Sequence, residues 1–291
     1  MNGAFAIGDE LLVLNTAIRR EYLKLPRDLA ALTRSFGIVL SPQLQRDTSV
    51  LAFAIECTDR LLDAIPEAGG RGKFSTDVLS FFRGENALNP LFAPCALEPQ
   101  EGPITPSGGE GGPAVAGPGE GIQGHHGLSP DLTPELIGWL ARLKEVAERH
   151  HVHAEFREIT RELLCNSEQM RTTQSDSRFV DCAVREGQLM VELLLLILAE
   201  VSTPSFADFM RRLAGPANLG DKLRDARCDY QRGEITIRPT WKFRARLACE
   251  MSSRVLRLTG FCIGNARLMT WGICSVCTEL FWFRFSRSHS H

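Results

Sequence analysis

The sequence lacks a strong net charge of either sign, because 33 Lys and Arg residues nearly balance 35 Asp and Glu residues and leave a net charge of only -2. This balance argues against a nucleic-acid partner, which a basic surface would favour. No apolar run reaches the ~20 residues that a membrane-spanning helix needs. The densest run, residues 189–201, is interrupted by Glu192 and predicts a core helix. No GxGxxG motif signals a nicotinamide site, so a reductive step with a nicotinamide is not supported.

Two features bear on the cellular location. The first ten residues lack a basic segment followed by an apolar core, which argues against a secretory signal and predicts a cytoplasmic protein. Residues 268–283 are apolar and carry Trp271 and Trp282, but Glu279 interrupts them. They predict at most a peripheral contact with a membrane.

The cysteines do not form a recognisable framework. There are nine, an odd number, which fits buried reduced thiols better than disulfides. Cys274 and Cys277 form a CxxC, with His289 and His291 downstream, but a zinc site needs a better-spaced second pair of ligands. A zinc site is therefore not favoured.

Glycine and proline are concentrated in residues 98–130, which carry six prolines and the runs GGEGGP and GPGEG. Such a segment neither continues a helix nor contributes to a core, so we expect a disordered insertion. The sequence on both sides has helical patterns. We therefore predict one domain over residues 1–291, with this segment as a long internal loop.

Apolar residues recur at helical spacing through most of the remaining chain. Residues 41–64 follow this spacing, and Thr133 and Pro134 suit the N-cap and first position of another helix. Only residues 234–238 alternate as a strand would. The predicted fold class is all-α. Further helices are expected over residues 154–166, 178–201, 205–214, 218–231 and 242–258.

Two acidic motifs repeat at helical spacing. Asp59 and Asp63 lie four residues apart, and Asp221, Asp225 and Asp229 continue the same spacing over two turns. Carboxylates four apart share one face of a helix, where they repel one another unless a cation lies between them. Magnesium prefers such oxygen ligands and leaves its other positions to water and phosphate.

The spacing alone has a second interpretation. Acidic pairs four apart also occur at Asp131 with Glu135 and at Glu158 with Glu162, where nothing indicates a site. The basic residues interleaved with the triple motif could simply neutralise a solvated helix face. A metal site and a solvated face therefore remain open on spacing alone.

The context of both motifs resembles the squalene/phytoene synthase family. Ser35 and Phe36 precede TDRLLD at residues 58–63, as an SF pair precedes a TDxLVD-like motif in that family. The stretch 221–239 resembles its NxxxDxxxD motif, with the trailing arginine, glycine and proline. The resemblance covers residues 34–64 and 179–239.

The resemblance implies an isoprenoid synthase helical bundle with a central cavity. In this family both aspartate motifs bind Mg²⁺ and, through it, the diphosphates of two prenyl substrates, here farnesyl or geranylgeranyl diphosphate, which are condensed head to head. It implies catalytic roles for Asp59, Asp63, Asp225 and Asp229, with Asp221 as a further metal ligand. The candidate substrate-binding residues are Ser35, Phe36, Arg171, Arg178, Lys222 and Arg232. The candidate aromatic walls for a carbocation are Phe36, Phe53 and Phe179.

The sequence also departs from the family pattern. Asp221 replaces the usual Asn, and Glu56 replaces a usual arginine, which puts one phosphate contact in doubt. The tyrosine–cysteine pair of the family is replaced near Asp181, and the chain has only Tyr22 and Tyr230. Two alternatives therefore stay open: a terpene synthase of the same fold that acts on one prenyl diphosphate, and a non-catalytic helical protein that binds a prenyl lipid or a partner.

Overall fold

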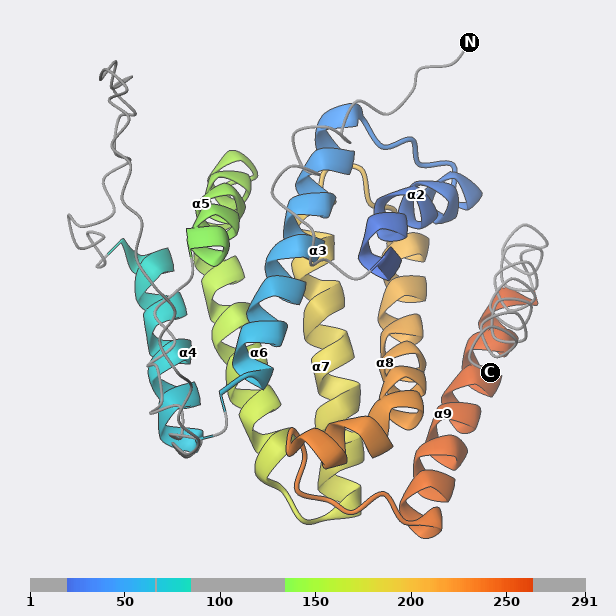
Figure 1. The fold of residues 1–291 in the computed structure, drawn as a ribbon. Coiled ribbons are helices and arrows are strands. Elements are labelled where there is room, and N and C mark those ends of the chain that lie inside the picture. Colours follow the sequence, from blue (N-terminus) through green and yellow to red (C-terminus); the bar gives the residue numbers. More distant parts are fainter. Residues whose placement is uncertain (1–19, 66, 85–133, 264–291) are drawn as a thin grey trace, which may run out of the picture.

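The computed structural model describes residues 20–65, 67–84 and 134–263, and within these ranges the chain forms α-helices joined by short connections, with no strand (Figure 1). The all-α prediction is confirmed. The glycine-rich segment 98–130, Thr133, the first ten residues, the apolar stretch 268–283 and the CxxC motif all lie outside the described residues. The helices are α2 (Arg20–Ser35), α3 (Pro42–Asp63), α4 (Ala68–Arg83), α5 (Pro134–Arg149), α6 (His153–Thr172), α7 (Asp176–Ile197), α8 (Pro204–Arg232) and α9 (Trp241–Cys262).

Polar caps fix where several helices begin. Ser41, Ser175, Thr203 and Thr240 stand directly before α3, α7, α8 and α9, and each side chain accepts a hydrogen bond from the backbone N–H three residues on. Such a cap satisfies one of the free N–H groups at a helix start. Gly233 ends α8 with a φ of 77°, a left-handed conformation that glycine adopts without strain.

Helix α8 corrects the prediction of two helices over residues 205–214 and 218–231. It runs unbroken from Pro204 to Arg232 and carries Pro216 in its interior. Proline inside a helix removes one backbone hydrogen bond, so a break was expected there. Gly215 and Pro216 are both buried, and the packing of this segment against its neighbours holds the helix together.

The expected strand at residues 234–238 is also wrong. The segment is extended but has no partner strand among the described residues. Its alternation is real, since Ile235 and Ile237 are buried. Between them, Thr236 donates its backbone N–H to the carbonyl of Arg171 and its hydroxyl to the carbonyl of Thr173. The segment is therefore fastened to the end of α6.

Helix α4 was not predicted, because three glycines in its first five residues lower helix propensity. Tertiary contacts stabilise it. Arg71 binds both carboxylate oxygens of Glu168 on α6, at 2.7 and 3.0 Å, and donates to the carbonyl of Ile65 at 3.0 Å. Phe74 and Phe82 on the same helix are fully buried.

Helix α7 lies inside the bundle and packs against α3, α6, α8 and α9, whereas α4 and α9 lie at opposite edges (Figure 1). Gly187 allows a close approach of α7 to α8. A Cβ atom on Gly187 would lie 2.5 Å from the carbonyl oxygen of Ala214 and 2.9 Å from the Cβ of Asn218. The residue therefore has to be glycine for these two helices to pack as they do.

The buried apolar residues form two clusters. The larger joins α2 to α6 with the C-terminal half of α7 and the start of α8. The smaller joins the start of α7, the second half of α8, α9 and residues 235–237. Both acidic motifs lie where α3, α6 and α8 meet.

Candidate functional site

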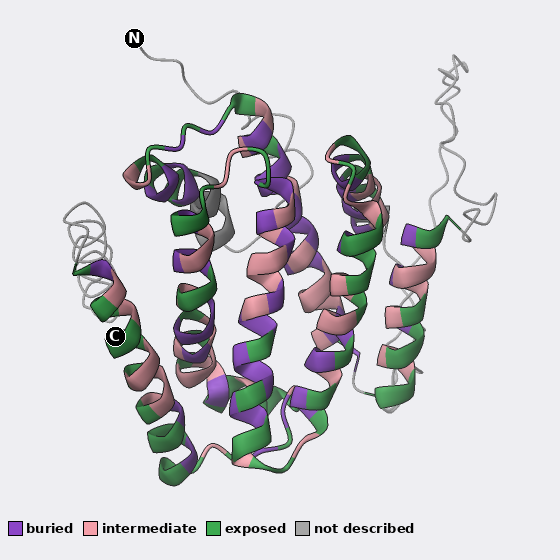
Figure 2. Cartoon of the chain, turned by 180° about the vertical axis from the view of Figure 1, so that it is seen from behind, coloured by how far each residue is buried: buried purple, intermediate pink, exposed green. Residues whose placement is uncertain are grey.

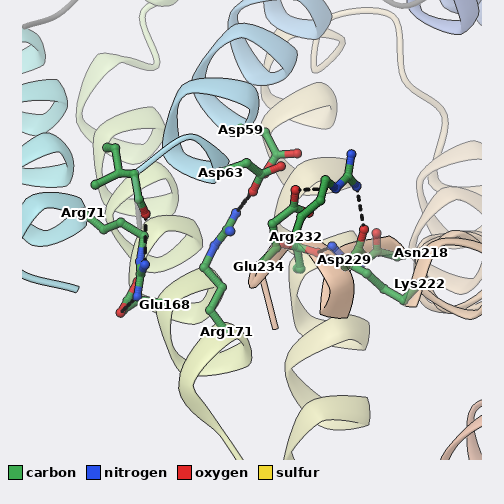
Figure 3. A network of polar contacts seen from close by, with 12 residues as sticks. Asp59, Asp63, Arg71, Glu168, Arg171, Asn218, Lys222, Asp229, Arg232 and Glu234 are labelled. Atoms are coloured by element: carbon green, nitrogen blue, oxygen red, sulfur yellow. Dashed lines mark hydrogen bonds and ion pairs between the residues drawn. The ribbon is translucent and has the colours of Figure 1, made fainter. Parts of the chain in front are cut away.

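The two acidic motifs come together at a polar pocket of about 520 Å³ that is open to solvent (Figure 3). All five aspartates of the motifs line it, although the two motifs are more than 150 residues apart in the sequence. The pocket is lined by Asp59, Asp63, Met170, Arg171, Asp221, Lys222, Asp225, Asp229, Arg232, Glu234 and Ile235.

On the α3 side, one arginine binds both aspartates of the first motif. Arg171 comes from the last turn of α6 and is buried. Its Nη2 donates to Oδ1 of Asp63 and lies 3.5 Å from Oδ1 of Asp59. Figure 3 shows its side chain extended toward Asp63. The guanidinium therefore stands where a cation shared by this pair would stand.

On the α8 side, a second arginine joins the end of the helix to the segment after it. Arg232 donates from Nη2 to Asp229 at 2.9 Å, and its Nε lies 2.7 Å from Glu234 (Figure 3). Arg224 similarly binds both Asp221 and Asp225. Each aspartate of this motif therefore contacts a guanidinium.

The pocket holds more acid than base, with six carboxylates against three basic side chains. Two carboxyl groups respond to this imbalance. Desolvation and the charge of Asp63 raise the pKa of Asp59 from 3.8 to about 7. Desolvation and the same charge raise the pKa of Glu234 to about 7, although Arg232 opposes the change. An added cation would relieve this excess of negative charge.

Behind the aspartates lies an ion pair that the sequence did not indicate. Glu186 of α7 is buried and accepts from Nζ of Lys222 at 3.1 Å and from Nδ2 of Asn218 at 3.0 Å. Burial alone would lower the pKa of Lys222, but the charges of Glu186 and Asp59 outweigh it and hold the pKa above its usual value. Lys222 therefore stays charged at the base of the pocket.

An apolar pocket of about 610 Å³ adjoins the polar one. Asp59 lines both pockets, and Glu186 also lines the apolar one. Leu51, Phe82 and Phe156 form part of its wall, together with further side chains from α3, α4, α5, α6 and α7. The arrangement can accept a molecule with an anionic end and a hydrocarbon end.

Several residues singled out in the sequence do not reach these pockets. Ser35 donates to the carbonyl of Ala31, and the ring of Phe36 packs at 5.3 Å from those of Phe206 and Phe209, near the start of α8. The expected role of Ser35 and Phe36 in substrate binding is therefore not supported.

The other outlying candidates are also engaged elsewhere. Arg178 is exposed and donates to Gln169 at 3.0 Å, so its expected diphosphate contact is not supported. Phe53 packs against Trp139, and Phe179 packs against Phe243. These rings are core residues, and the aromatic side chains that line the apolar pocket are those of Phe82 and Phe156.

Sequence reasoning missed three kinds of residue. Glu186 lies four residues before Met190 and seven before Leu193, and all three line the apolar pocket, so helical spacing could have placed Glu186 on that face. Glu234 follows the helix-ending Gly233, but a carboxylate after a helix end is no signal by itself. Phe82 belongs to the unpredicted α4.

The resemblance implies a magnesium ion, which needs several oxygen ligands close to one another. Among the described residues, no group of three or more His, Cys, Asp or Glu side chains is gathered closely enough to hold a metal ion. The donor chemistry nonetheless fits, because the pocket offers hard carboxylate oxygens in excess of its basic groups. A bound ion would have to displace Arg171 from Asp63.

No described helix combines the length and hydropathy needed to cross a membrane. The six described cysteines, Cys57, Cys165, Cys182, Cys228, Cys249 and Cys262, are free thiols.

Comparison of the chain with protein family models, with curated proteins and with solved structures finds no match in any of the three.

Proposed function

We propose that the protein is a Mg²⁺-dependent prenyl transferase of the squalene/phytoene synthase type, with an isoprenoid synthase helical bundle. One observation carries the proposal. Asp59 lies on the wall shared by a pocket of carboxylates and basic groups and a pocket of apolar side chains. A prenyl diphosphate has this division, since a diphosphate is joined directly to a hydrocarbon chain.

The residues divide into two groups by chemistry. Asp59, Asp63, Asp221, Asp225 and Asp229 offer oxygen ligands and would hold the magnesium. Arg171, Lys222 and Arg232 would bind diphosphate oxygens, which suits the fork of donors on arginine. When bound, magnesium would supply electrostatic stabilisation of the diphosphate leaving group.

The apolar pocket would orient the hydrocarbon chain and exclude water from a carbocation. Phe82 and Phe156 present aromatic rings there, which attract a cation by about 0.5 to 2 kcal/mol each. Leu51, Leu140 and Leu193 complete an apolar lining that would shield the reacting carbon from hydrolysis.

The test is incubation of the purified protein with Mg²⁺ and geranyl, farnesyl or geranylgeranyl diphosphate, with analysis of diphosphate and organic products. We expect diphosphate release and a C30 or C40 hydrocarbon from two substrate molecules. Asp59→Asn and Asp225→Asn should each abolish turnover. If neither change altered Mg²⁺-dependent turnover, the assignment of the site would be wrong.

A second candidate is a terpene synthase that ionises a single prenyl diphosphate. It is favoured because Asp181, near which the resemblance would expect the tyrosine, is exposed, and no tyrosine among the described residues lines either pocket. A cyclic or hydroxylated product from one substrate molecule would support it. Failure of all three substrates to release diphosphate or to stabilise the protein would favour a non-catalytic binding protein.

A further inference from the structure

Helix α9 covers the molecule at one edge and is packed from one side only. It contacts α8 and α7, and its buried residues are confined to Phe243, Leu247 and Cys262. Figure 2 shows the rest of the helix exposed or half-buried. Among the described residues, an unpartnered face therefore runs along the length of α9.

The centre of this face carries a stripe of residues at three-, four- and seven-residue spacing. We call it the outer stripe: Trp241, Ala245, Cys249, Ser252, Leu256 and Ile263. Its three large members are strongly exposed, with Trp241 at 75%, Leu256 at 72% and Ile263 at 71%. Large apolar side chains left in water along one line of a helix indicate a contact surface.

Basic residues flank the outer stripe. We call them the basic flank: Lys242, Arg244, Arg246 and Arg257, all of them exposed. Among the described residues none of the four pairs with a carboxylate. Arg257 donates to Ser253 at 3.3 Å, and Lys242 lies over the ring of Trp241.

The acidic side chain of α9 is paired with an arginine on the packed side of the helix. Glu250 is the one acidic residue of α9, and it binds Arg254 at 2.8 Å. Arg254 lies against Gly215 of α8, on the packed side of the helix. The outward face is therefore purely basic, although the chain as a whole carries a net charge of -2.

We propose that the outward face of α9 is a docking surface for an anionic lipid bilayer. A helix with an apolar line flanked by Lys and Arg lies in the plane of a membrane, with its apolar residues among the acyl chains and its basic residues at the head groups. Trp241 suits this boundary, because its ring has an apolar body and a polar N–H. The surface adds to the proposed activity and does not depend on it.

The positive charge of this face favours an anionic bilayer over a second copy of the chain. Two outer stripes packed together would bring the basic flanks of both copies side by side, which like charges disfavour. The small residues Ala245, Cys249 and Ser252 would also bury little apolar area in such a pair. A nucleic acid would neutralise the basic flank but leave Leu256 and Ile263 in water.

Sedimentation of the purified full-length protein with lipid vesicles tests the proposal. We expect binding to phosphatidylcholine vesicles that contain phosphatidylserine, weak binding to pure phosphatidylcholine, and loss of binding as salt rises. Each basic residue near an anionic surface changes partitioning about fivefold. Loss of three such residues accounts for roughly a hundredfold, so the charge-reversal variant K242E/R246E/R257E should bind at least about a hundredfold more weakly.

A control variant carries the same change of net charge on other helices. R46E/R142E/R157E alters three exposed basic residues of α3, α5 and α6 and should keep nearly all binding. L256S/I263S should weaken binding at constant charge. Circular dichroism should show all three variants folded, since each changed residue is exposed.

Two results would overturn the proposal. One is vesicle binding that survives both α9 variants, because another part of the chain would then carry it. The other is the absence of binding to anionic vesicles, whether or not the protein self-associates or retains a nucleic acid.

Discussion

Burial and a neighbouring charge both raise the pKa of the Asp59 carboxyl group. Desolvation and the charge of Asp63 favour the protonated form, and the pKa rises to about 7. The folded protein therefore holds this proton more tightly than the unfolded chain, whose group titrates near 3.8. Stability is lost as pH rises through the window from about 4 to about 7, because the unfolded chain ionises first.

Asp59→Asn should therefore stabilise the protein at pH 8 in metal-free buffer. We expect a gain of about 1 kcal/mol there, kept small because the side chain is 42% exposed and solvent screens its charge. The gain should shrink toward pH 5, where Asp59 is protonated and neutral like asparagine. Urea denaturation at both pH values measures it. A gain of equal size at pH 5 and pH 8 would contradict the assigned protonation.

Asp208, whose side chain is 46% exposed, provides the matched control for this experiment. It lies on α8 and pairs with Arg212 at 2.9 Å, outside both pockets. Asp208→Asn removes the same charge without relieving the pocket. We expect no stabilisation at pH 8 from this change.

Arg171 contacts both aspartates of the first acidic motif. Replacing it with methionine keeps most of its volume but leaves Asp59 and Asp63 without their guanidinium. We expect Arg171→Met to lower the free energy of unfolding by about 2 kcal/mol, less than for a fully buried pair because Asp59 is partly exposed. Added Mg²⁺ should restore more stability to this variant than to the wild type.

Thermal unfolding with and without Mg²⁺ measures both effects. Arg161→Met is the control, since Arg161 pairs with Glu158 on the exposed face of α6. That change should be nearly neutral and should not respond to Mg²⁺. Equal responses of Arg171→Met and the wild type to Mg²⁺ would show that the ion does not bind where Arg171 lies.

At the scale of elements, the contact between α7 and α8 depends on one missing side chain. Gly187→Ala would place a Cβ atom 2.5 Å from the carbonyl oxygen of Ala214, so one helix must move. Overpacking of this kind costs about 1 to 3 kcal/mol. We expect Gly187→Ala to lower the midpoint of urea denaturation.

Gly138 on α5 offers the opposite case. A Cβ atom there meets nothing within 4 Å, and the residue is exposed within its helix. Gly138→Ala should stabilise by up to about 1 kcal/mol, as expected for glycine in a helix. If both substitutions changed stability in the same direction, close packing at Gly187 would not be the cause.

The limits of sequence prediction also lie at this scale. Helical spacing predicted α3, α6, α7 and α9, because this signal is local, and only the end of α6 was missed by more than four residues. Pro216 and the glycines of α4 are local signals too, but here tertiary packing overrides them. The alternation at residues 234–238 correctly marked Ile235 and Ile237 as buried and yet did not make a strand, since no partner strand lies beside the segment.

For the molecule as a whole, the sequence predicted that two acidic motifs lie on helices, and the fold brings them to one pocket. Spacing could not predict that Arg171 and Arg232 would be their partners, because those contacts join α6 to α3 and the end of α8 to the segment after it. For Ser35 and Phe36, the sequence predicted a role at the site that the structure does not support. They belong to the same resemblance, but the ring of Phe36 packs against the start of α8, away from both pockets.

The central claim is that the polar and apolar pockets bind the two ends of one molecule. Calorimetry with three ligands tests it directly: a farnesyl diphosphate analogue whose bridging oxygen is replaced by sulfur, inorganic pyrophosphate, and farnesol. In the presence of Mg²⁺ the analogue should bind roughly a hundredfold more tightly than either fragment, since burial of its chain adds to the contacts of its diphosphate. Asp59→Asn should weaken the binding of the analogue more than the binding of either fragment. An analogue that binds no more tightly than pyrophosphate, or not at all, would contradict the account.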